Sequence, residues 1–237
     1  MSVRKLKKKW EKYADINTFK AIDSEAKNHI EFWTRGKKLA YIILEDTNLP
    51  LLNRNNVKIL DLGCGIGRIA RFIAMKKYQV YGVDISPTMI DLARKYNQDL
   101  PNLKFIVNDG KSIPFPSNHF DLVYSVLVFQ HLPKDIAELY LSEFWRVLKP
   151  SGKLWLQVPR TPMVTRPHFP IVFLSPYIHR KFAERRHKDL SFSRYYSRGE
   201  IITLLSRFNF KVIKVRRIIE KYGHIWLCTT AIKIIKE

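Results

Sequence analysis

The sequence predicts an α/β fold: a doubly wound, mostly parallel sheet of seven strands that ends in an antiparallel hairpin. Strand and helix patterns alternate from residue 57 to residue 158. The last two strand patterns, 210–219 and 224–234, are joined by a linker too short for a helical crossover, so we expect them to pair antiparallel. A glycine-rich turn directly after the first strand indicates a ligand site at one edge of the sheet.

The elements of the sheet follow in a regular order. Apolar runs rich in β-branched residues predict the other five strands at 57–62, 79–84, 104–108, 120–128 and 153–158. Helical spacing predicts helices from the glycine turn to about residue 77, and at 86–97, 134–148 and 197–207. Ser86 and Pro87 favour a helix start, as N-cap and first helical residue.

Composition limits the class of protein. A chain of 237 residues with 46% hydrophobic residues can bury one sizeable core. No apolar run is long enough to span a membrane and no secretory leader is evident, so we expect a soluble, cytoplasmic protein. Its two cysteines, Cys64 and Cys228, favour a reducing compartment and exclude a cysteine-built zinc site, and no metal is expected.

The net charge of +21 makes this a basic protein. More than half of the excess lies in residues 161–237, which hold 16 lysines and arginines against 5 acids. Such a field favours anionic partners such as nucleic acid, phosphorylated metabolites or an anionic lipid surface. A compositional bias with the charge spread over solvent is the alternative.

The glycine turn has the spacing G-x-G-x-G, with Gly63, Gly65 and Gly67, after a strand that ends near Asp61. Glycines let backbone N–H groups approach a nucleotide cofactor closely. The dinucleotide fingerprint G-x-G-x-x-G requires a small residue at the position that Arg68 occupies here. The turn therefore indicates a nucleotide cofactor other than a dinucleotide.

Three acids, Asp61, Asp84 and Asp109, follow or end successive strands and so meet at the carboxyl edge of the sheet, where ligands of such sheets bind. Asp84 lies about 20 residues beyond the glycine turn, the usual distance for a carboxylate that accepts ribose hydroxyls. Asp109, followed by Gly110, is placed to accept a hydrogen bond from an adenine amino group. The three acids predict a cofactor that contains adenosine; Asp61 could instead cap the turn, and Asp109 could be an ordinary turn acid.

In these motifs the chain resembles the class I S-adenosylmethionine-dependent methyltransferases, in particular the broad group of small-molecule and quinone-type enzymes. The resemblance rests on five segments in the family's order and covers roughly residues 57–158: ILDLGCGIG at 59–67, VYGVDISP at 80–87, NDG and IPFP within 108–116, FDLVYSV at 120–126 and RVLKPSG at 146–152. It implies a Rossmann-like fold, S-adenosylmethionine as cofactor and S-adenosylhomocysteine as product.

The resemblance also implies roles for single residues. The three glycines would wrap the methionine and ribose portions, and Asp61 would organise the amino-group end. Asp84 would hold the ribose hydroxyls, Ile85 would pack on the adenine, and Asp109, with Gly110 nearby, would bind the adenine amino group. The backbone at Ser125 or Val126 would help to hold the cofactor's ammonium.

His131 follows the fourth strand and is the candidate general base for transfer of the methyl group to an O, N, S or C nucleophile. A structural histidine that donates to a carbonyl is the alternative.

Helical spacing predicts two helices, at 10–21 and 24–45. The resemblance implies that this N-terminal segment, residues 1–54, is a helical lid over the cofactor of a methyltransferase domain at 55–237. Arg35 could pair with the methionine carboxylate, or be an exposed helix arginine.

Residues 160–197 correspond to the family's acceptor-binding insertion and mix aromatic with basic side chains. A small-molecule acceptor is favoured. RNA, bound through the basic C-terminal third, is the alternative, and a lipid-like acceptor or a plain aromatic core also remains open. A non-catalytic cofactor-binding scaffold is the third hypothesis; the intact glycines and Asp84 argue against it.

Overall fold

A computed structural model describes residues 2–23, 26–49, 54–160, 194–219 and 225–235 of the chain. Within them, seven strands form one sheet in the order β3-β2-β1-β4-β5-β7-β6. The sheet is parallel from β3 to β5, and β7 pairs antiparallel with both β5 and β6. The predicted doubly wound sheet with its closing antiparallel hairpin is confirmed.

The strands agree closely with the apolar runs in the sequence. Their bounds are β1 Lys58–Leu62, β2 Gln79–Asp84, β3 Leu103–Val107, β4 Phe120–Val126, β5 Leu148–Pro159, β6 Phe210–Ile219 and β7 Ile225–Lys233. The central strands are buried on both faces: Ile59 and Leu60 of β1 have no exposed surface. Near-continuous apolar runs are expected of strands covered on both sides.

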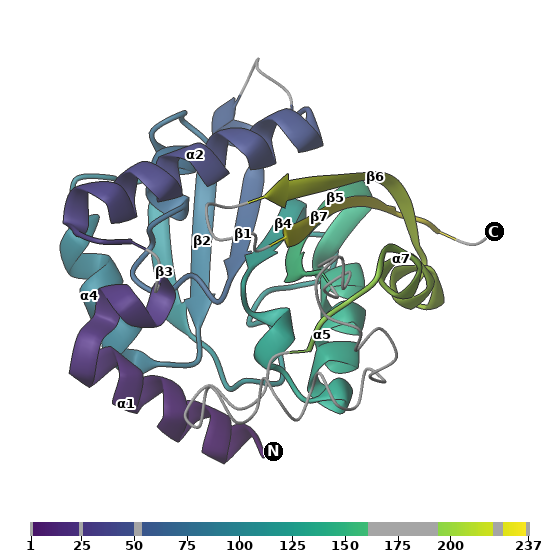
Figure 1. Ribbon diagram of the computed structural model, residues 1–237. Coiled ribbons are helices and arrows are strands. Elements are labelled where there is room, and N and C mark those ends of the chain that lie inside the picture. The colour runs from purple at the N-terminus through teal and green to yellow at the C-terminus, as the bar shows by residue number, and fades with distance from the viewer. Residues whose placement is uncertain (1, 24–25, 50–53, 161–193, 220–224, 236–237) are drawn as a thin grey trace.

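Helices cover both faces of the sheet (Figure 1). One face is packed by α2 His29–Thr47, α3 Ala70–Ala74 and α4 Pro87–Tyr96, and the other by α5 Lys134–Val147 and α7 Arg198–Arg207. Residues of α2 and α3 such as Ile43 and Ile73 share a core with Ile59 of β1, and Phe144 of α5 packs in the opposite core with Leu60. Because successive side chains of β1 point to opposite faces of the sheet, β1 contributes to both cores.

Helix α1, Val3–Ile22, lies on neither face. It lies beyond the carboxyl ends of β1 and β2 and beside α4 (Figure 1). It begins seven residues earlier than expected because the Ser2 side chain caps it, accepting a hydrogen bond from the Lys5 N–H at 3.4 Å. Asn28 caps α2 in the same way, which places the start of α2 at His29.

Two elements differ from their predicted bounds for local reasons. Helix α3 is only five residues long because Gly67, at φ 80°, cannot be part of a right-handed helix and the turn continues to Ile69. Strand β5 begins at Leu148, which pairs with Phe120 of β4 before an irregularity in register. The residues between the helix predicted at 134–148 and the strand predicted at 153–158 thus form an irregular start of β5.

Candidate functional site

The glycine turn joins β1 to α3 at the carboxyl edge of the sheet. Gly63, Gly65 and Gly67 have φ values of 75°, 51° and 80°, a region that side chains strongly disfavour. The N–H groups of Gly63 and Cys64 donate to the Val83 carbonyl at 2.8 and 3.1 Å, which fastens the turn to β2. The spacing of the glycines is therefore required by the backbone conformation itself.

Asp84, at the end of β2, closes the other side of the turn. Its Oδ2 accepts from the Gly65 N–H at 2.9 Å and its Oδ1 from the Ser86 N–H at 3.0 Å. Burial raises the pKa of Asp84, and these backbone hydrogen bonds partly oppose the rise. Each carboxylate oxygen keeps a further lone pair, so the group can still accept from two ligand hydroxyls.

Asp61, in β1, is buried beneath the turn and accepts a hydrogen bond from the Tyr124 hydroxyl at 2.8 Å. Burial raises the pKa of Asp61 to about 7 against the lowering effect of Tyr124; the nearby Asp84 carboxylate raises it further and Arg68 lowers it. A carboxyl group in this state ionises readily when a cation approaches.

Asp109 lies just beyond β3 and is exposed. Its carboxylate accepts from the N–H groups of Lys111 and Ser112, at 2.8 and 2.7 Å, and from the Ser112 hydroxyl at 3.0 Å. Partial burial raises its pKa, but these hydrogen bonds outweigh the burial and lower it overall. These are the hydrogen bonds of a turn acid, and they leave the carboxylate able to accept from a further donor.

Gly110 and Ile85 lie together beside Asp109. A Cβ built on Gly110 would come within 2.7 Å of Ile85 Cδ1, and the φ of Gly110 is 78°. The fold therefore brings together two of the residues to which the resemblance gives a place around the adenine.

Ser125 and Val126 end β4 on the opposite side of the turn. The Ser125 hydroxyl is buried and donates to the Leu62 carbonyl at 2.9 Å, so it ties β4 to β1. Val126 and the next residue, Leu127 at φ 60°, reach the cavity described below.

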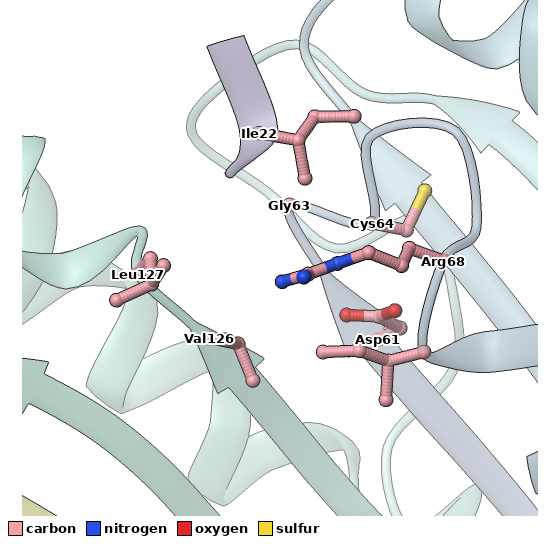
Figure 2. A pocket seen from close by; sticks show the side chains of 8 residues that line it. Ile22, Asp61, Gly63, Cys64, Arg68, Val126 and Leu127 are labelled. Carbon is pink, nitrogen blue, oxygen red and sulfur yellow. The ribbon is translucent and has the colours of Figure 1, made fainter. Parts of the chain in front are cut away.

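A cavity of about 30 Å³ lies against the glycine turn. Its lining comes from five parts of the chain that the fold brings together: Ile22, Asp61, Gly63, Cys64, Arg68, Ile69, Val126 and Leu127. Figure 2 shows the Arg68 guanidinium and the Asp61 carboxylate extending into the same space. This volume is far too small for a nucleoside.

Arg35 lies on α2 and pairs with Asp23, its Nε donating to Asp23 Oδ2 at 2.7 Å. The same oxygen accepts from Arg68, which is buried. The sequence singled out Arg35, used Arg68 only to tell two motifs apart, and gave no sign of Asp23. A buried acid just beyond an amphipathic helix next to the site is a signal that only the tertiary structure supplies.

The first half of helix α1 packs against residues that follow β2 and β3 at the carboxyl edge of the sheet. Val3, at its first turn, packs on Gly110: a Cβ on that glycine would lie 2.7 Å from Val3 Cγ1. Glu11 reaches the start of α4, where it accepts from the Thr88 hydroxyl at 2.7 Å.

The same helix also packs against the glycine turn and against the residues that follow β4. Ile22, its last residue, packs on Gly65: a Cβ there would lie 2.8 Å from Ile22 Cδ1. Trp10 lies edge-on to His131, with 5.3 Å between ring centroids. His131 is thus half-buried at the end of the short 3₁₀ helix Phe129–His131, after β4. It contacts α1 at the carboxyl edge of the sheet, and the region between α1 and this edge is called the groove below.

The ends of the predicted acceptor insertion lie close to His131. The Arg194 N–H donates to the Gln130 carbonyl and the Tyr196 N–H to the Pro159 carbonyl, both at 2.9 Å. Residues 161–193, which hold most of the aromatic and basic side chains, lie outside the described residues.

Across the described parts of the chain no group of three histidine, cysteine or acidic side chains could hold a metal ion. No described helix is long and apolar enough to cross a membrane.

Comparisons with known proteins agree with this geometry. Residues 60–156 match a family model described as a methyltransferase domain. Over 97 residues the chain is 36% identical to the 2-methyl-6-phytyl-1,4-hydroquinone methyltransferase of Synechocystis, which covers 40% of this chain and 30% of that protein. It is 40% identical over 116 residues to the trans-aconitate 2-methyltransferase of Deinococcus radiodurans, 48% of this chain and 42% of that protein.

The chain thus spans less than half the length of these curated relatives. Among solved structures, magnesium protoporphyrin IX methyltransferase from Synechocystis, with bound S-adenosylhomocysteine, aligns with a TM-score of 0.70 at 15% identity. The alignment covers 98% of this chain and all of that one, so the likeness of fold extends through α1 and the hairpin.

The residues of the site fit this cofactor: a glycine turn with its N–H groups fixed, a carboxylate at the end of β2, and a carboxylate and a guanidinium side by side. The cavity at the glycine turn is smaller than this cofactor. Residues 60–156 thus match a methyltransferase domain, and in its fold and its five motifs the chain is similar to the class I S-adenosylmethionine-dependent methyltransferases.

Proposed function

We propose that this chain transfers the sulfonium methyl group of S-adenosylmethionine to an O, N, S or C nucleophile on a small molecule. The observation that carries the proposal is the glycine turn fastened to Asp84. Gly65 donates to the same carboxylate that a ribose would use, so the turn and the ribose acceptor form one unit.

The cofactor, when bound, supplies a methyl group that is already activated for attack, and the protein supplies proximity, alignment and exclusion of water. The three glycines hold the methionine and ribose portions, and Asp84 accepts from the ribose hydroxyls. Asp61 binds the amino group, with the Tyr124 hydroxyl orienting its carboxylate. Ile85 packs on the adenine beside Gly110, and Asp109 lies next to the adenine amino group.

His131 holds or removes the acceptor's proton on the β4 side of the groove. Support comes from its place: it follows β4, faces α1 through Trp10, and is adjacent to Gln130, which anchors the returning end of the insertion. A base so placed contributes when the acceptor is a weak acid.

Residues 1–54 act as a lid, because α1 lies along the groove from Gly110 at one end to Gly65 at the other. A nucleoside cannot reach Gly65 while the Ile22 side chain covers it. Entry of the cofactor therefore requires α1 to move, and its return would exclude water from the reaction.

A small-molecule acceptor is supported by the relatives, whose names specify a hydroquinone, a demethylmenaquinone, sterols and trans-aconitate. The RNA alternative loses support in the described part of the C-terminal third. There Lys214 and Arg216 pair with the buried Asp46, and Lys233 is buried against Asn118 and the Leu148 carbonyl. Part of the basic excess thus stabilises the hairpin.

The test is methyl transfer from radiolabelled S-adenosylmethionine into fractionated cell extract. We expect the label in the small-molecule or lipid-extractable fraction, insensitive to ribonuclease. Label that ribonuclease releases would favour the RNA alternative. A protein that binds the cofactor but labels no fraction would favour the scaffold.

A further inference from the structure

The first three turns of α1 carry a high density of positive charge. Of the twelve residues from Val3 to Ala14, six are lysine or arginine and one, Glu11, is an acid. The Glu11 carboxylate faces α4, where it accepts from the Thr88 hydroxyl. The first turn of the helix contains no acid. The charge that this segment presents to solvent is therefore dominated by cations.

Four of these cations share the outward face of α1. Arg4, Lys8 and Lys12 follow one another at intervals of four residues, so they form one row along the helix. Lys5 lies beside this row, and all four side chains are exposed. The opposite face packs into the protein, where Leu6 is buried in the core. The four exposed residues are called the α1 basic face below.

This arrangement is unfavourable for the helix by itself. Like charges four residues apart on a helix repel one another, and Arg4 with Lys8 and Lys8 with Lys12 are such pairs. Cations near the start of a helix also oppose its dipole, because the positive end of the dipole lies there. An anionic partner on the α1 basic face would relieve both effects.

The α1 basic face lies on the outer side of the groove. Trp10, which lies between Lys8 and Lys12 in the chain, contacts His131 on the inner side of the helix, with 5.3 Å between ring centroids. The helix itself lies at the periphery of the molecule, beyond the carboxyl ends of β1 and β2 (Figure 1). A partner bound to the α1 basic face is therefore next to the region where the acceptor would react.

The chemistry of this face favours a membrane that contains anionic lipids over RNA. Three of its four residues are lysines, which bind phosphate as point charges, whereas arginine is the better suited residue for nucleic-acid recognition. RNA-binding surfaces also use aromatic side chains as platforms for the bases, and none of the four residues is aromatic. The outer side of a helix is convex, so a flat surface of lipid headgroups can contact the whole row at once.

We propose that the α1 basic face binds the surface of a membrane that contains anionic lipids, and so holds the groove against the source of a lipid-like acceptor. The binding surface is a property of α1, whereas its connection to an acceptor rests on the proposed function. The attraction is electrostatic, so the association is reversible and weakens as the ionic strength rises.

The test is flotation of the full chain with lipid vesicles at physiological ionic strength. Vesicles of phosphatidylcholine alone are compared with vesicles that also contain phosphatidylglycerol. We expect the chain to float only with the vesicles that contain phosphatidylglycerol, and to be released from them when salt is added.

Two variants with the same net charge locate the binding surface. The first replaces the α1 basic face with glutamine: Arg4→Gln, Lys5→Gln, Lys8→Gln and Lys12→Gln. The control replaces four exposed lysines of α2, the turn before β2, β3 and β6: Lys38→Gln, Lys77→Gln, Lys104→Gln and Lys211→Gln. Glutamine has nearly the helix propensity of lysine, so α1 should still form.

Each cation close to an anionic membrane strengthens binding by about fivefold, so the first variant should bind the phosphatidylglycerol vesicles more than a hundredfold more weakly than the wild type. The control variant should lose less than about tenfold, because charges that lie farther from the membrane are screened by salt.

Equal weakening in the two variants would overturn the inference, since net charge alone would then explain the binding. A wild type that binds neither kind of vesicle, or both equally, would also overturn it. The RNA reading would replace it if the wild type prefers an RNA oligonucleotide to the phosphatidylglycerol vesicles at the same salt concentration and the first variant alone loses that RNA.

The proposed function is judged by a separate measurement, titration of the wild type with S-adenosylhomocysteine in the absence of vesicles. A chain that floats with anionic vesicles through α1 but does not bind this ligand would refute the proposed function and leave the membrane surface standing. A chain that binds the ligand but fails the flotation test would do the reverse, so the two failures are distinguishable.

Discussion

The side chain of Ile22 lies against Gly65, so close that a methyl group added to the glycine would come within 2.8 Å of Ile22 Cδ1. This contact joins the last residue of α1 to the middle of the glycine turn. It is an apolar contact at the place where we propose that the polar cofactor binds. If the proposal holds, Ile22 and the ligand compete for the same backbone.

Ile22→Ala tests this competition. The substitution removes the side chain from Gly65, and we expect S-adenosylhomocysteine to bind roughly fivefold more tightly, the equivalent of about 1 kcal/mol. Loss of the packed side chain should also lower the unfolding free energy by on the order of 1–3 kcal/mol. Calorimetric titration and denaturant melts measure the two effects. Unchanged or weaker binding would mean that Ile22 is not in the path of the cofactor.

Gly65→Ala should have the opposite effect on binding. Gly65 has a φ of 51°, which costs a residue with a Cβ on the order of 1–2 kcal/mol, and the new methyl group would also meet Ile22. We expect at least a tenfold loss of affinity for S-adenosylhomocysteine and a lower melting temperature.

Gly199→Ala is the matched control for this substitution. No atom lies within 4 Å of a Cβ at Gly199, in helix α7, and alanine favours the helix by up to about 1 kcal/mol. Binding should stay at the wild-type value and stability should rise slightly. A comparable loss of affinity in both variants would remove the case for a specific role of the turn.

The pH dependence of stability tests the environment of Asp61. Its pKa is raised by burial from 3.8 to about 7, so the folded protein binds a proton that the unfolded chain has released. The contribution of this group to stability is therefore fully present below about pH 4 and is lost as the pH rises through about 7. In denaturant melts between these values, Asp61→Asn should show a smaller fall in unfolding free energy than the wild type. Parallel curves for the two proteins would contradict the assignment.

The same group predicts a pH dependence of cofactor binding. The ammonium of the methionine portion favours the ionised Asp61, so affinity for S-adenosylhomocysteine should increase as the pH rises from about 5.5 to about 7.5. Tyr124→Phe removes the hydrogen bond that lowers the pKa of Asp61, so the rise in affinity should move to higher pH. A rise that stays at the same pH in the variant would show that another group is responsible.

His131→Gln separates a catalytic from a structural histidine. If the imidazole removes the acceptor's proton, kcat should fall by about 10²- to 10⁴-fold while the affinity for S-adenosylhomocysteine stays the same. His119→Gln is the control, because His119 precedes β4 and so lies at the opposite edge of the sheet from the site, where it stacks on Phe115. Unchanged methyl transfer by His131→Gln would show that His131 is a structural residue.

Most of the sheet could be predicted from the sequence because its signals are local. The strand QVYGVD at 79–84 and the start of α4 at Pro87, capped by Ser86, follow from a short apolar run and two neighbouring residues. The hairpin followed from the length of its linker. The length of α3 could not be predicted, because it depends on the left-handed conformation of Gly67.

Only a part of the candidate site could be predicted from the sequence, namely the residues whose positions follow from the order of the strands. Asp61, Asp84 and the glycines lie at strand ends, so the order of the strands brings them together. Asp23 and Arg68 are 45 positions apart, and Asp23 lies at the end of α1. The position of α1 does not follow from the pairing of the strands, so their contact could not be predicted. A helical cover and a turn role for Asp109 were expected only in outline: neither the contact of Ile22 with Gly65 nor the three hydrogen bonds that Asp109 accepts could be predicted from the sequence.

The most direct measurement of the central claim is the shift in melting temperature that S-adenosylhomocysteine produces in three proteins: the wild type, Asp84→Asn, and Asp91→Asn on the exposed side of α4. Ligand at a hundred times its Kd should stabilise the wild type and Asp91→Asn by about 2.7 kcal/mol, a rise of several degrees. Asp84→Asn should lose most of this shift because the ribose loses its acceptor. No shift in the wild type, or an equal shift in all three proteins, would contradict a cofactor site at the glycine turn and Asp84.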